Sequence, residues 1–350
     1  MSDDANILTN TAGRLFADLC TDDVLHRAEA GEWLPAPWGA VEEIGLPFAL
    51  VAEDAGGFGL PVGDALDLVR LAAFHGLPLP LAETMLANHL LGNAGLDVGA
   101  GVASVAPVLA EERLHLTREG EKWRLAGQCR RVPWGRNAAT IAVWGLYEGQ
   151  PHIATVSAGG WRVETGTNIA GSPRDTVIFD TVLPASAVAA VEYDIEEQIA
   201  ALAALRVLAM AGALERVLEL TAAYAGERVQ FGRPIGKFQA VQQNMAVLAE
   251  QSCAAAAAAN IAARGFVAND ILAIAIAKVR AGEAASVGAG IAHQVHGAIG
   301  FTAEHRLHFF TKQLWSWRDE LGSEAVWSRR IGRHMAKAGA EALWPLVTNI

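Results

Sequence analysis

Residues 230–239 read QFGRPIGKFQ, a decapeptide broken by glycine and proline. It stands between residues 196–224 and 240–266, two runs rich in alanine and leucine, which are strong helix formers. Two glycines and a proline interrupt the helical pattern here. The basic residues gathered at this break are Arg228, Arg233 and Lys237. Exposed backbone amides and an arginine at a helix end can bind a diphosphate. The break therefore predicts an anion-contacting loop.

A second unusual stretch lies downstream, QVHGAIGFTAEHRLH, residues 294–308. It also combines glycine, a polar amide and charged residues between helical segments. Taken alone, it fits an ordinary connection between two helices equally well.

Outward from these two stretches, the chain divides into three regions of different periodicity. Residues 1–101 repeat apolar residues at helical spacing, with a glycine-rich loop expected at 53–60. Residues 102–190 contain short runs rich in β-branched and aromatic residues, ATIAVWG, HIATVSAGG and DTVIFDTVLP, which predict a small antiparallel barrel or sandwich. Residues 191–350 are helical almost throughout and predict a helical bundle that associates through its helices. Asn269 is expected to cap the helix that follows it.

Composition limits the partners and the compartment. The formal net charge of −11 argues against nucleic acid, because phosphate binding needs clustered Lys and Arg. No uninterrupted apolar run reaches the roughly 18 residues of a membrane span, and the N-terminus lacks a signal-peptide pattern. The three cysteines have no metal-ligand spacing, and neither do the histidines and carboxylates. We therefore expect a cytoplasmic globular protein with no metal site.

Together the two stretches resemble the flavin-dependent acyl-CoA dehydrogenases. The strongest parts of the resemblance are RVQFGRPIGKFQAVQ and QVHGAIGFTAEH, with weaker support from EDAGGFGL near residue 55. The resemblance covers essentially the whole chain and implies an α+β, mostly α fold. Its expected parts are an N-terminal helical domain (1–101), a middle antiparallel β domain (102–190) and a C-terminal four-helix bundle (191–350).

The resemblance also implies an FAD cofactor and the residues that contact it. In this family the first loop reaches across a dimer interface to the neighbour's FAD. Arg228 then matches an arginine on the diphosphate, while Phe231 and Gln239 match residues that lie against the cofactor. The second FAD-contacting segment is Gln294, Val295, His296, Gly297 and Ala298, where Ala298 replaces the second glycine of the family's pair.

The family's reaction removes two hydrogens from an acyl-CoA thioester. A carboxylate takes the α-proton, which is poorly acidic, inside a dry pocket. The family places this glutamate at one of two positions, which correspond to Leu321 and Leu202 here. Glu320 is adjacent to Leu321, but one residue on a helix turns a side chain by about 100°. The sequence therefore assigns no catalytic residue, with Glu320 as a weak candidate.

Three hypotheses about the function remain open. In the first, the chain is the non-catalytic subunit of a heterotetramer, and a homologous partner chain supplies the base, as in bacterial family members that act on bulky, steroid-derived CoA thioesters. In the second, it is a self-sufficient homo-oligomeric enzyme that uses Glu320. In the third, it is a flavin-free scaffolding or binding protein. By the same resemblance, the electron acceptor is an electron-transferring flavoprotein.

Two further groups have structural and functional interpretations. His296 and His305 flank the second loop, where hydrogen-bonding structural roles are commoner than catalysis. The segment LWSWRDELGSEAVWSRR, residues 314–330, interleaves tryptophans with charges and predicts a helix that buries its aromatics. Trp315 and Trp317 are alternatively expected to fill the cavity that an acyl chain would otherwise occupy.

Overall fold

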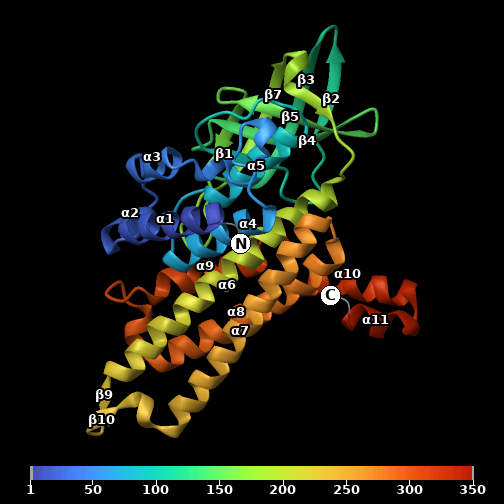
Figure 1. The fold of residues 1–350 in the computed structure, drawn as a ribbon. Coiled ribbons are helices and arrows are strands. Elements are labelled where there is room, and N and C mark those ends of the chain that lie inside the picture. Colours follow the sequence, from blue (N-terminus) through green and yellow to red (C-terminus); the bar gives the residue numbers. More distant parts are fainter. Residues whose placement is uncertain (1–2, 349–350) are drawn as a thin grey trace. The chain divides into compact units, whose positions relative to one another are not determined.

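The computed structural model describes residues 3–348, which form two compact units (Figure 1). The first unit contains Met1–Leu66 and Pro78–Leu202, and the second contains Asp67–Leu77 and Ala203–Ile350. Helices come first in the chain, a sheet follows, and long helices complete it. The expected fold class, mostly α with a β module between helical regions, is confirmed. The three domain boundaries given above stay a prediction.

The helical part of the first unit comprises short helices: α1 (Asp3–Leu19), α2 (Asp22–Glu29), α3 (Pro35–Glu43), α5 (Leu81–Asn93) and the 3-10 turns η1 (Leu46–Phe48) and η2 (Glu53–Ala55). Helix α4 (Val62–His75) contributes residues to both units. The glycine-rich segment 53–60 is a loop after one 3-10 turn, as expected. A Cβ at Gly57 would lie 1.9 Å from the Val51 carbonyl oxygen, so this loop tolerates only glycine there.

The β module of the first unit is an eight-stranded sheet in the order β6-β7-β3-β2-β4-β5-β8, with β1 paired to β4. Its strands are β1 (Ala103–Ala106), β2 (His115–Glu119), β3 (Lys122–Pro133), β4 (Thr140–Tyr147), β5 (Gln150–Ser157), β6 (Trp161–Glu164), β7 (Arg174–Leu183) and β8 (Val188–Ala190). The three apolar runs named above became β4, β5 and β7.

The prediction of a wholly antiparallel module is wrong for two pairings. Strand β1 pairs with β4 in parallel, and β2 meets β4 in parallel at His115 and Leu146. All four residues of β1 are buried, which is the pattern expected of a parallel strand that is covered on both faces. The alternation of polar and apolar residues in the neighbouring strands gave no sign of this central apolar strand.

The second unit is built from long helices (Figure 1). They are α6 (Ile195–Glu227), most of which belongs here, α7 (Gln239–Ala268), α8 (Ile271–His296), α9 (Leu307–Asp319), α10 (Glu324–Ala338) and α11 (Leu343–Thr348), with η4 (Ile235–Lys237), η5 (Gly297–Phe301) and η6 (Ala340–Ala342). Small residues allow these helices to approach closely. A Cβ at Gly288 of α8 would lie 2.6 Å from Leu214 of α6 and 3.3 Å from Leu248 of α7.

The connection between α7 and α8 corrects one expectation. Asn269 ends α7 in the left-handed conformation, with φ 53°, and does not cap α8. Asp270 caps α8 instead, because its carboxylate accepts hydrogen bonds from the amides of Leu272 and Ala273. An asparagine tolerates the left-handed region well, which explains why the two polar residues divide the roles in this order.

Helix α7 is long and apolar enough to cross a membrane by length and composition alone. Its apolar character comes from the alanine run 254–259, in which Ala255, Ala258 and Ala259 are buried. The helix packs along α8. This arrangement identifies α7 as a bundle helix of the second unit.

Candidate functional site

The break at residues 230–239 is a tight hairpin between α6 and α7. Strands β9 (Val229–Gln230) and β10 (Arg233–Pro234) pair antiparallel around the turn Phe231-Gly232. Both turn residues have positive φ, 51° and 79°, as a two-residue hairpin turn of type I′ requires. Glycine adopts this conformation freely, whereas a phenylalanine in it is strained. Such strain concentrates at functional positions.

The side chains of this hairpin face outward. Phe231 is 93% exposed, and Arg228 and Gln239 are exposed as well. The Arg233 guanidinium lies over the Phe238 ring at 4.2 Å from its centroid. Within residues 3–348, Arg228 has no carboxylate partner, and the Phe231 ring at the tip of the hairpin packs edge-on against Phe238, with centroids 6.1 Å apart.

The second segment is the end of a helix followed by a 3-10 turn. Gln294, Val295 and His296 form the last turn of α8, and Gly297 leaves it with φ 64°. Gln294, Gly297 and Ala298 are exposed, whereas Val295 and His296 are buried. A side chain built at Gly297 would meet no atom within 4 Å, so the backbone here is open to an approaching group.

A buried histidine, His296, packs beneath the exposed residues of this segment and holds the end of α8 in place. His296 stacks on Tyr224 at 4.5 Å, and its Nδ1 lies 2.8 Å from the Ala292 carbonyl oxygen. Burial, with smaller contributions from the nearby His305 and His293, lowers the pKa of His296 to about 4. His296 is therefore a neutral structural ring at physiological pH, in line with the commoner role expected of it.

His293 forms the centre of an aromatic stack. Its ring lies 4.0 Å from that of Phe301 and 5.4 Å from that of Trp315, both nearly parallel to it. Its Nε2 lies 2.9 Å from the Thr311 hydroxyl oxygen. Trp315 is thus tied to the segment that follows α8, and its structural role in this unit is observed directly.

The position at which the family carries its glutamate holds Leu321, in a turn between α9 and α10. Leu321 has a φ of 60°, and its carbonyl oxygen accepts a hydrogen bond from Trp327 Nε1 at 3.1 Å. Lys278, 1% exposed, donates from Nζ to the carbonyl oxygens of Arg318 and Gly322 at 2.6 and 3.1 Å. The turn is held at three carbonyls and presents an apolar side chain.

Glu320 is engaged in an ion pair. Its Oε2 accepts a hydrogen bond from Arg206 Nε at 2.8 Å, and the two side chains are 18% and 5% exposed. A carboxylate paired with a buried guanidinium is stabilised in its ionised form, and its protonation would leave the guanidinium charge unpaired. Such a carboxylate is a poor proton acceptor. The other family position, Leu202, is 1% exposed.

Sequence reasoning missed Arg206 and Lys278. Arg206 was visible as an isolated cation in the apolar run LAALRVLAM, and Lys278 as a cation that follows the apolar run LAIAIA, two residues before Arg280. A lone charge in such a run is almost never buried without a partner, so these two residues predict a buried polar network.

Polar groups of β1 and of the segment after β3 have partners inside the first unit. Ser104, the hydroxyl residue of β1, donates to the Pro133 carbonyl oxygen. Trp134 follows β3 with φ 55° and packs edge-on against Trp33, with centroids 6.0 Å apart. Arg136 pairs with Asp175, whose carboxylate is fully buried. The segment around Trp134 is therefore held in place by contacts within its own unit.

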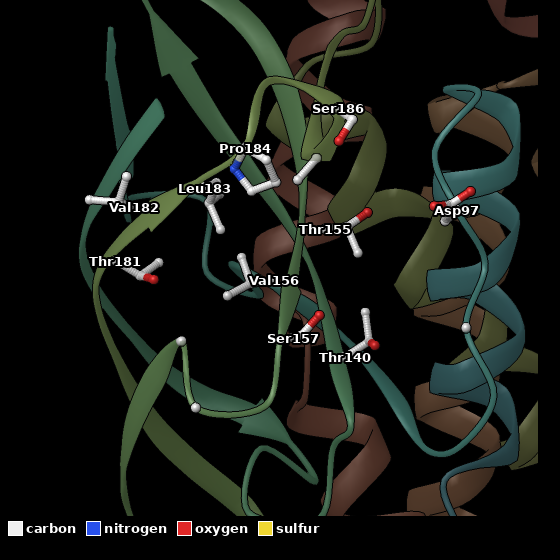
Figure 2. A pocket seen from close by; sticks show the side chains of 14 residues that line it. Asp97, Thr140, Thr155, Val156, Ser157, Thr181, Val182, Leu183, Pro184 and Ser186 are labelled. Carbon is white, nitrogen blue, oxygen red and sulfur yellow. The ribbon is translucent and has the colours of Figure 1, made fainter. Parts of the chain in front are cut away.

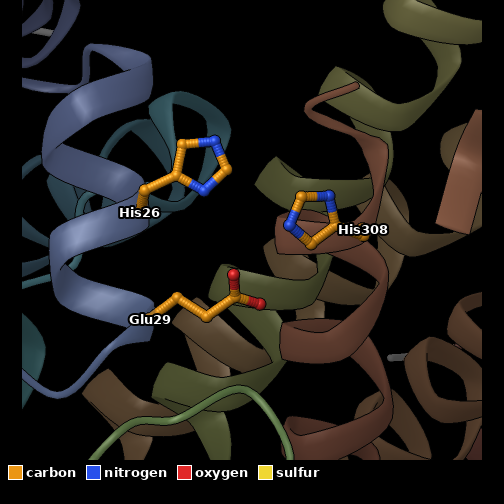
Figure 3. Close-up of side chains that lie close together, drawn as sticks. All are labelled: His26, Glu29 and His308. Carbon is orange, nitrogen blue, oxygen red and sulfur yellow. The ribbon is translucent and has the colours of Figure 1, made fainter. Parts of the chain in front are cut away.

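Each unit contains histidines and carboxylates, the residue types that bind metal ions. In the first unit His26 and Glu29 leave α2 on the same side (Figure 3). In the second, His308 begins α9 with its Nδ1 2.8 Å from the His305 carbonyl oxygen. Within neither unit do three such ligands of the described residues come together.

Comparison with known proteins places this geometry in a family. The family model described as acyl-CoA dehydrogenase, C-terminal domain, matches residues 194–336. The acyl-CoA dehydrogenase IpdE2 of Mycolicibacterium smegmatis is 25% identical over 346 residues, covering 95% of this chain and 98% of that protein. The acyl-CoA dehydrogenase FadE34 of Mycobacterium tuberculosis is 30% identical, covering 86% of this chain but 42% of its own length.

Solved structures agree over the full length. The Tcur3481-Tcur3483 steroid ACAD G363A variant superposes with a TM-score of 0.85 at 25% identity, covering 96% of this chain and 98% of that one. A chain of the ChsE4-ChsE5 complex from Mycobacterium tuberculosis has the same fold, with a TM-score of 0.85 at 23% identity over 97% and 99% of the two chains. Fold and sequence relatives thus converge: residues 194–336 match the C-terminal domain of acyl-CoA dehydrogenases, and over nearly its whole length the chain is similar to acyl-CoA dehydrogenases, which are generally flavin-dependent.

Proposed function

We propose that this chain is the non-catalytic subunit of a heteromeric, cytoplasmic acyl-CoA dehydrogenase that acts on a bulky, steroid-derived CoA thioester. A homologous partner chain supplies the carboxylate that removes the α-proton. The observation that carries this proposal is the absence of an available carboxylate at the Leu321 turn, where the adjacent Glu320 is paired with Arg206 at 2.8 Å.

The residues of the second unit fit a phosphate-bearing cofactor that is held mainly by another chain. Arg228 offers a cation, Phe231 an aromatic face and Gln239 an amide, all exposed in this chain. Gln294, Gly297 and Ala298 expose a polar side chain and open backbone, while Val295 and His296 support them from within. Side chains that reach a ligand across an interface must be exposed in the separate subunit, as these are.

The residues of the first unit fit the flavin ring less well. Ser104 and Arg136 already have partners inside their own unit, so they are not available as donors to a ring. FAD, when bound, would accept the hydride from the β-carbon, and this chain's residues would hold its diphosphate and exclude water. We further propose that electrons leave to an electron-transferring flavoprotein.

The relatives support the substrate class and the assembly. One similar structure is named as a steroid ACAD with two components, and another is a complex of two named chains. These are properties of those proteins, and for this chain they motivate the choice of partner and substrate in the test.

Co-expression tests the proposal. The chain expressed alone is expected to be colourless, and the complex with a homologous dehydrogenase chain that retains the family glutamate is expected to be yellow and to oxidise a steroid-derived acyl-CoA. Arg228→Met should lower the flavin content of the complex, whereas Arg329→Met, at an exposed arginine of α10, should not. A single chain that is yellow and turns over acyl-CoA would contradict the proposal, and a chain that never binds flavin would identify a scaffold.

A further inference from the structure

The first unit contains a cavity of about 500 Å³ with no assigned ligand (Figure 2). This volume lies within the usual range for small-molecule sites. The cavity is lined by the ends of β5 and β7, the start of β4, the turn η3 (Ala185–Ala187) and the loop after α5. It involves none of the residues assigned above to flavin or to proton transfer.

The lining is rich in hydroxyl groups because of strand register. Thr140 of β4 lies directly opposite Ser157 of β5, and Thr155 lies two residues before Ser157 on the same strand. Residues two apart on a strand share a face, so Thr155 and Ser157 present their hydroxyls to the same side. Figure 2 shows Thr140, Thr155 and Ser157 near one another, with Asp97 on the facing segment.

Two further hydroxyls complete the wall. Thr181 of β7 contributes one, and after Pro184 the chain turns back so that Ser186 contributes another. The following strand β8 pairs with β5 at Val188 and Ala154, which brings η3 beside Thr155. Gly160 also lines the cavity, and no larger residue fits there because a Cβ would lie 2.6 Å from Val156 Cγ1.

These polar groups are not used by the fold. The six polar side chains of the lining are Asp97, Thr140, Thr155, Ser157, Thr181 and Ser186, and none of them bonds to another side chain or backbone group among residues 3–348. The Thr155 hydroxyl oxygen is buried and still has no partner. A buried hydroxyl without a hydrogen bond is costly, and a rotation of the Thr155 side chain toward the cavity would let a bound ligand supply the missing partner.

The chemistry of the lining selects the class of ligand. The described residues that line the cavity include one carboxylate and no Lys, Arg or His, which disfavours anions. Hydroxyls both donate and accept, whereas a carboxylate only accepts, so the ligand must donate at least one hydrogen bond. Val156 and Leu183 also line the cavity, but both are buried, and Val156 points to the opposite face of β5 from Thr155 and Ser157. We propose that this cavity binds a neutral polyhydroxy compound of monosaccharide size through Thr155, Ser157 and Asp97.

Ligand-observed NMR on the full chain tests this inference, with D-glucose as the neutral probe and D-gluconate as its anionic counterpart. Glucose is expected to bind in the millimolar range and gluconate about tenfold more weakly, since Asp97 repels it. Thr155→Val, which keeps the side-chain shape, should weaken glucose binding about fivefold, the value of one hydrogen bond. The control Thr117→Val removes an exposed hydroxyl of β2 outside the cavity and should change nothing.

Two further readouts separate binding from folding. Thr155→Val should leave the melting temperature of the free chain unchanged or raise it, because it removes an unpartnered buried hydroxyl. Ser186→Trp, at an exposed position of η3, should fill the cavity and abolish binding in a folded protein. The inference is overturned if neither probe binds, if gluconate binds as well as glucose, or if Thr155→Val and Ser186→Trp bind glucose like the wild type.

Discussion

Arg206 and Glu320 form an ion pair, 2.8 Å between Nε and Oε2, beneath the turn that carries Leu321. The pair joins α6 to the end of α9 within the second unit. The carboxylate of Glu320 lies one residue from the family's catalytic position, and the ion pair with Arg206 engages that carboxylate. The pair therefore bears on the stability of this chain and on the proposal that the catalytic base comes from a partner chain.

The first prediction concerns the cost of breaking this pair. Arg206→Met leaves Glu320 without its guanidinium partner, and we expect a loss of about 3 kcal/mol of unfolding free energy. Glu320→Gln leaves Arg206, 5% exposed, without its counter-charge, and a comparable loss is expected even though glutamine still accepts a hydrogen bond. Denaturant unfolding of the two single variants and the double variant measures the coupling.

The same variant decides the role of Glu320 in catalysis. In the co-expressed complex, Glu320→Gln is expected to retain turnover of acyl-CoA, since the base comes from the partner. Removal of the partner's own glutamate should abolish turnover. If the chain is instead a self-sufficient enzyme that uses Glu320 as its base, Glu320→Gln should bind flavin but lose activity.

The second prediction is a pH dependence from Lys278. Burial lowers the pKa of Lys278 to about 8 from an ordinary value near 10.5, against the opposing effects of Glu324, Glu320 and Asp319. Between these two values the unfolded chain holds more protons than the folded one, so stability rises with pH in this window. The rise is expected to reach at most about 3 kcal/mol.

Lys278→Met is the matched variant for that measurement. It removes the titrating amine and also leaves the carbonyls of Arg318 and Gly322 without their donor. The second effect lowers stability by a constant amount, whereas the first removes the pH dependence. Wild type and variant should therefore diverge in melting temperature as pH rises from 8 to 10.5, and parallel curves would count against the assignment.

How much of this was foreseeable from the sequence depends on how far apart the interacting residues lie. The strands β4, β5 and β7, the long helices and the break between them at 230–239 follow local patterns and are present. The hairpin form of that break was not predicted, and its contact with an anion stays a prediction. The parallel pairing of β1 with β4 joins Ala103 to Thr140, a contact that no local periodicity reports. The Arg206–Glu320 pair spans 114 residues, and only the presence of a lone arginine in an apolar helix hinted that a partner existed.

The third prediction concerns acid. The pKa of His296 falls to about 4 because the ring is buried, and His305 and His293 add to the effect. The unfolded chain takes up its proton near pH 6.5, so stability is lost as pH falls from about 6.5 to 4. His296→Phe keeps the stack on Tyr224 without the charge, and it should unfold at lower pH than the wild type. Identical acid midpoints would assign the transition to other groups.

The fourth prediction distinguishes packing from substrate selection at Trp315. Trp315→Ala removes one ring of the stack formed with His293 and Phe301, and we expect a loss of about 3 kcal/mol in unfolding free energy. The preference of the complex for acyl chain length should not change. Trp344→Ala is the control, because that ring is 73% exposed and its loss should be neutral. A changed chain-length preference in Trp315→Ala would place this ring in the acyl pocket.

The last prediction separates stability from function at the hairpin tip. Phe231 occupies the first turn position with a φ of 51°, where asparagine followed by glycine is the preferred pair. Phe231→Asn creates that pair with Gly232, so the isolated chain should be as stable as the wild type or more stable. If Phe231 lies against the cofactor of the partner, the complex of this variant should nevertheless lose flavin, whereas Phe231→Tyr, which keeps the ring, should retain it. Thermal unfolding of the single chain and flavin absorbance of the purified complex measure the two effects independently, and full flavin retention by Phe231→Asn would show that this strained, 93% exposed ring serves another purpose.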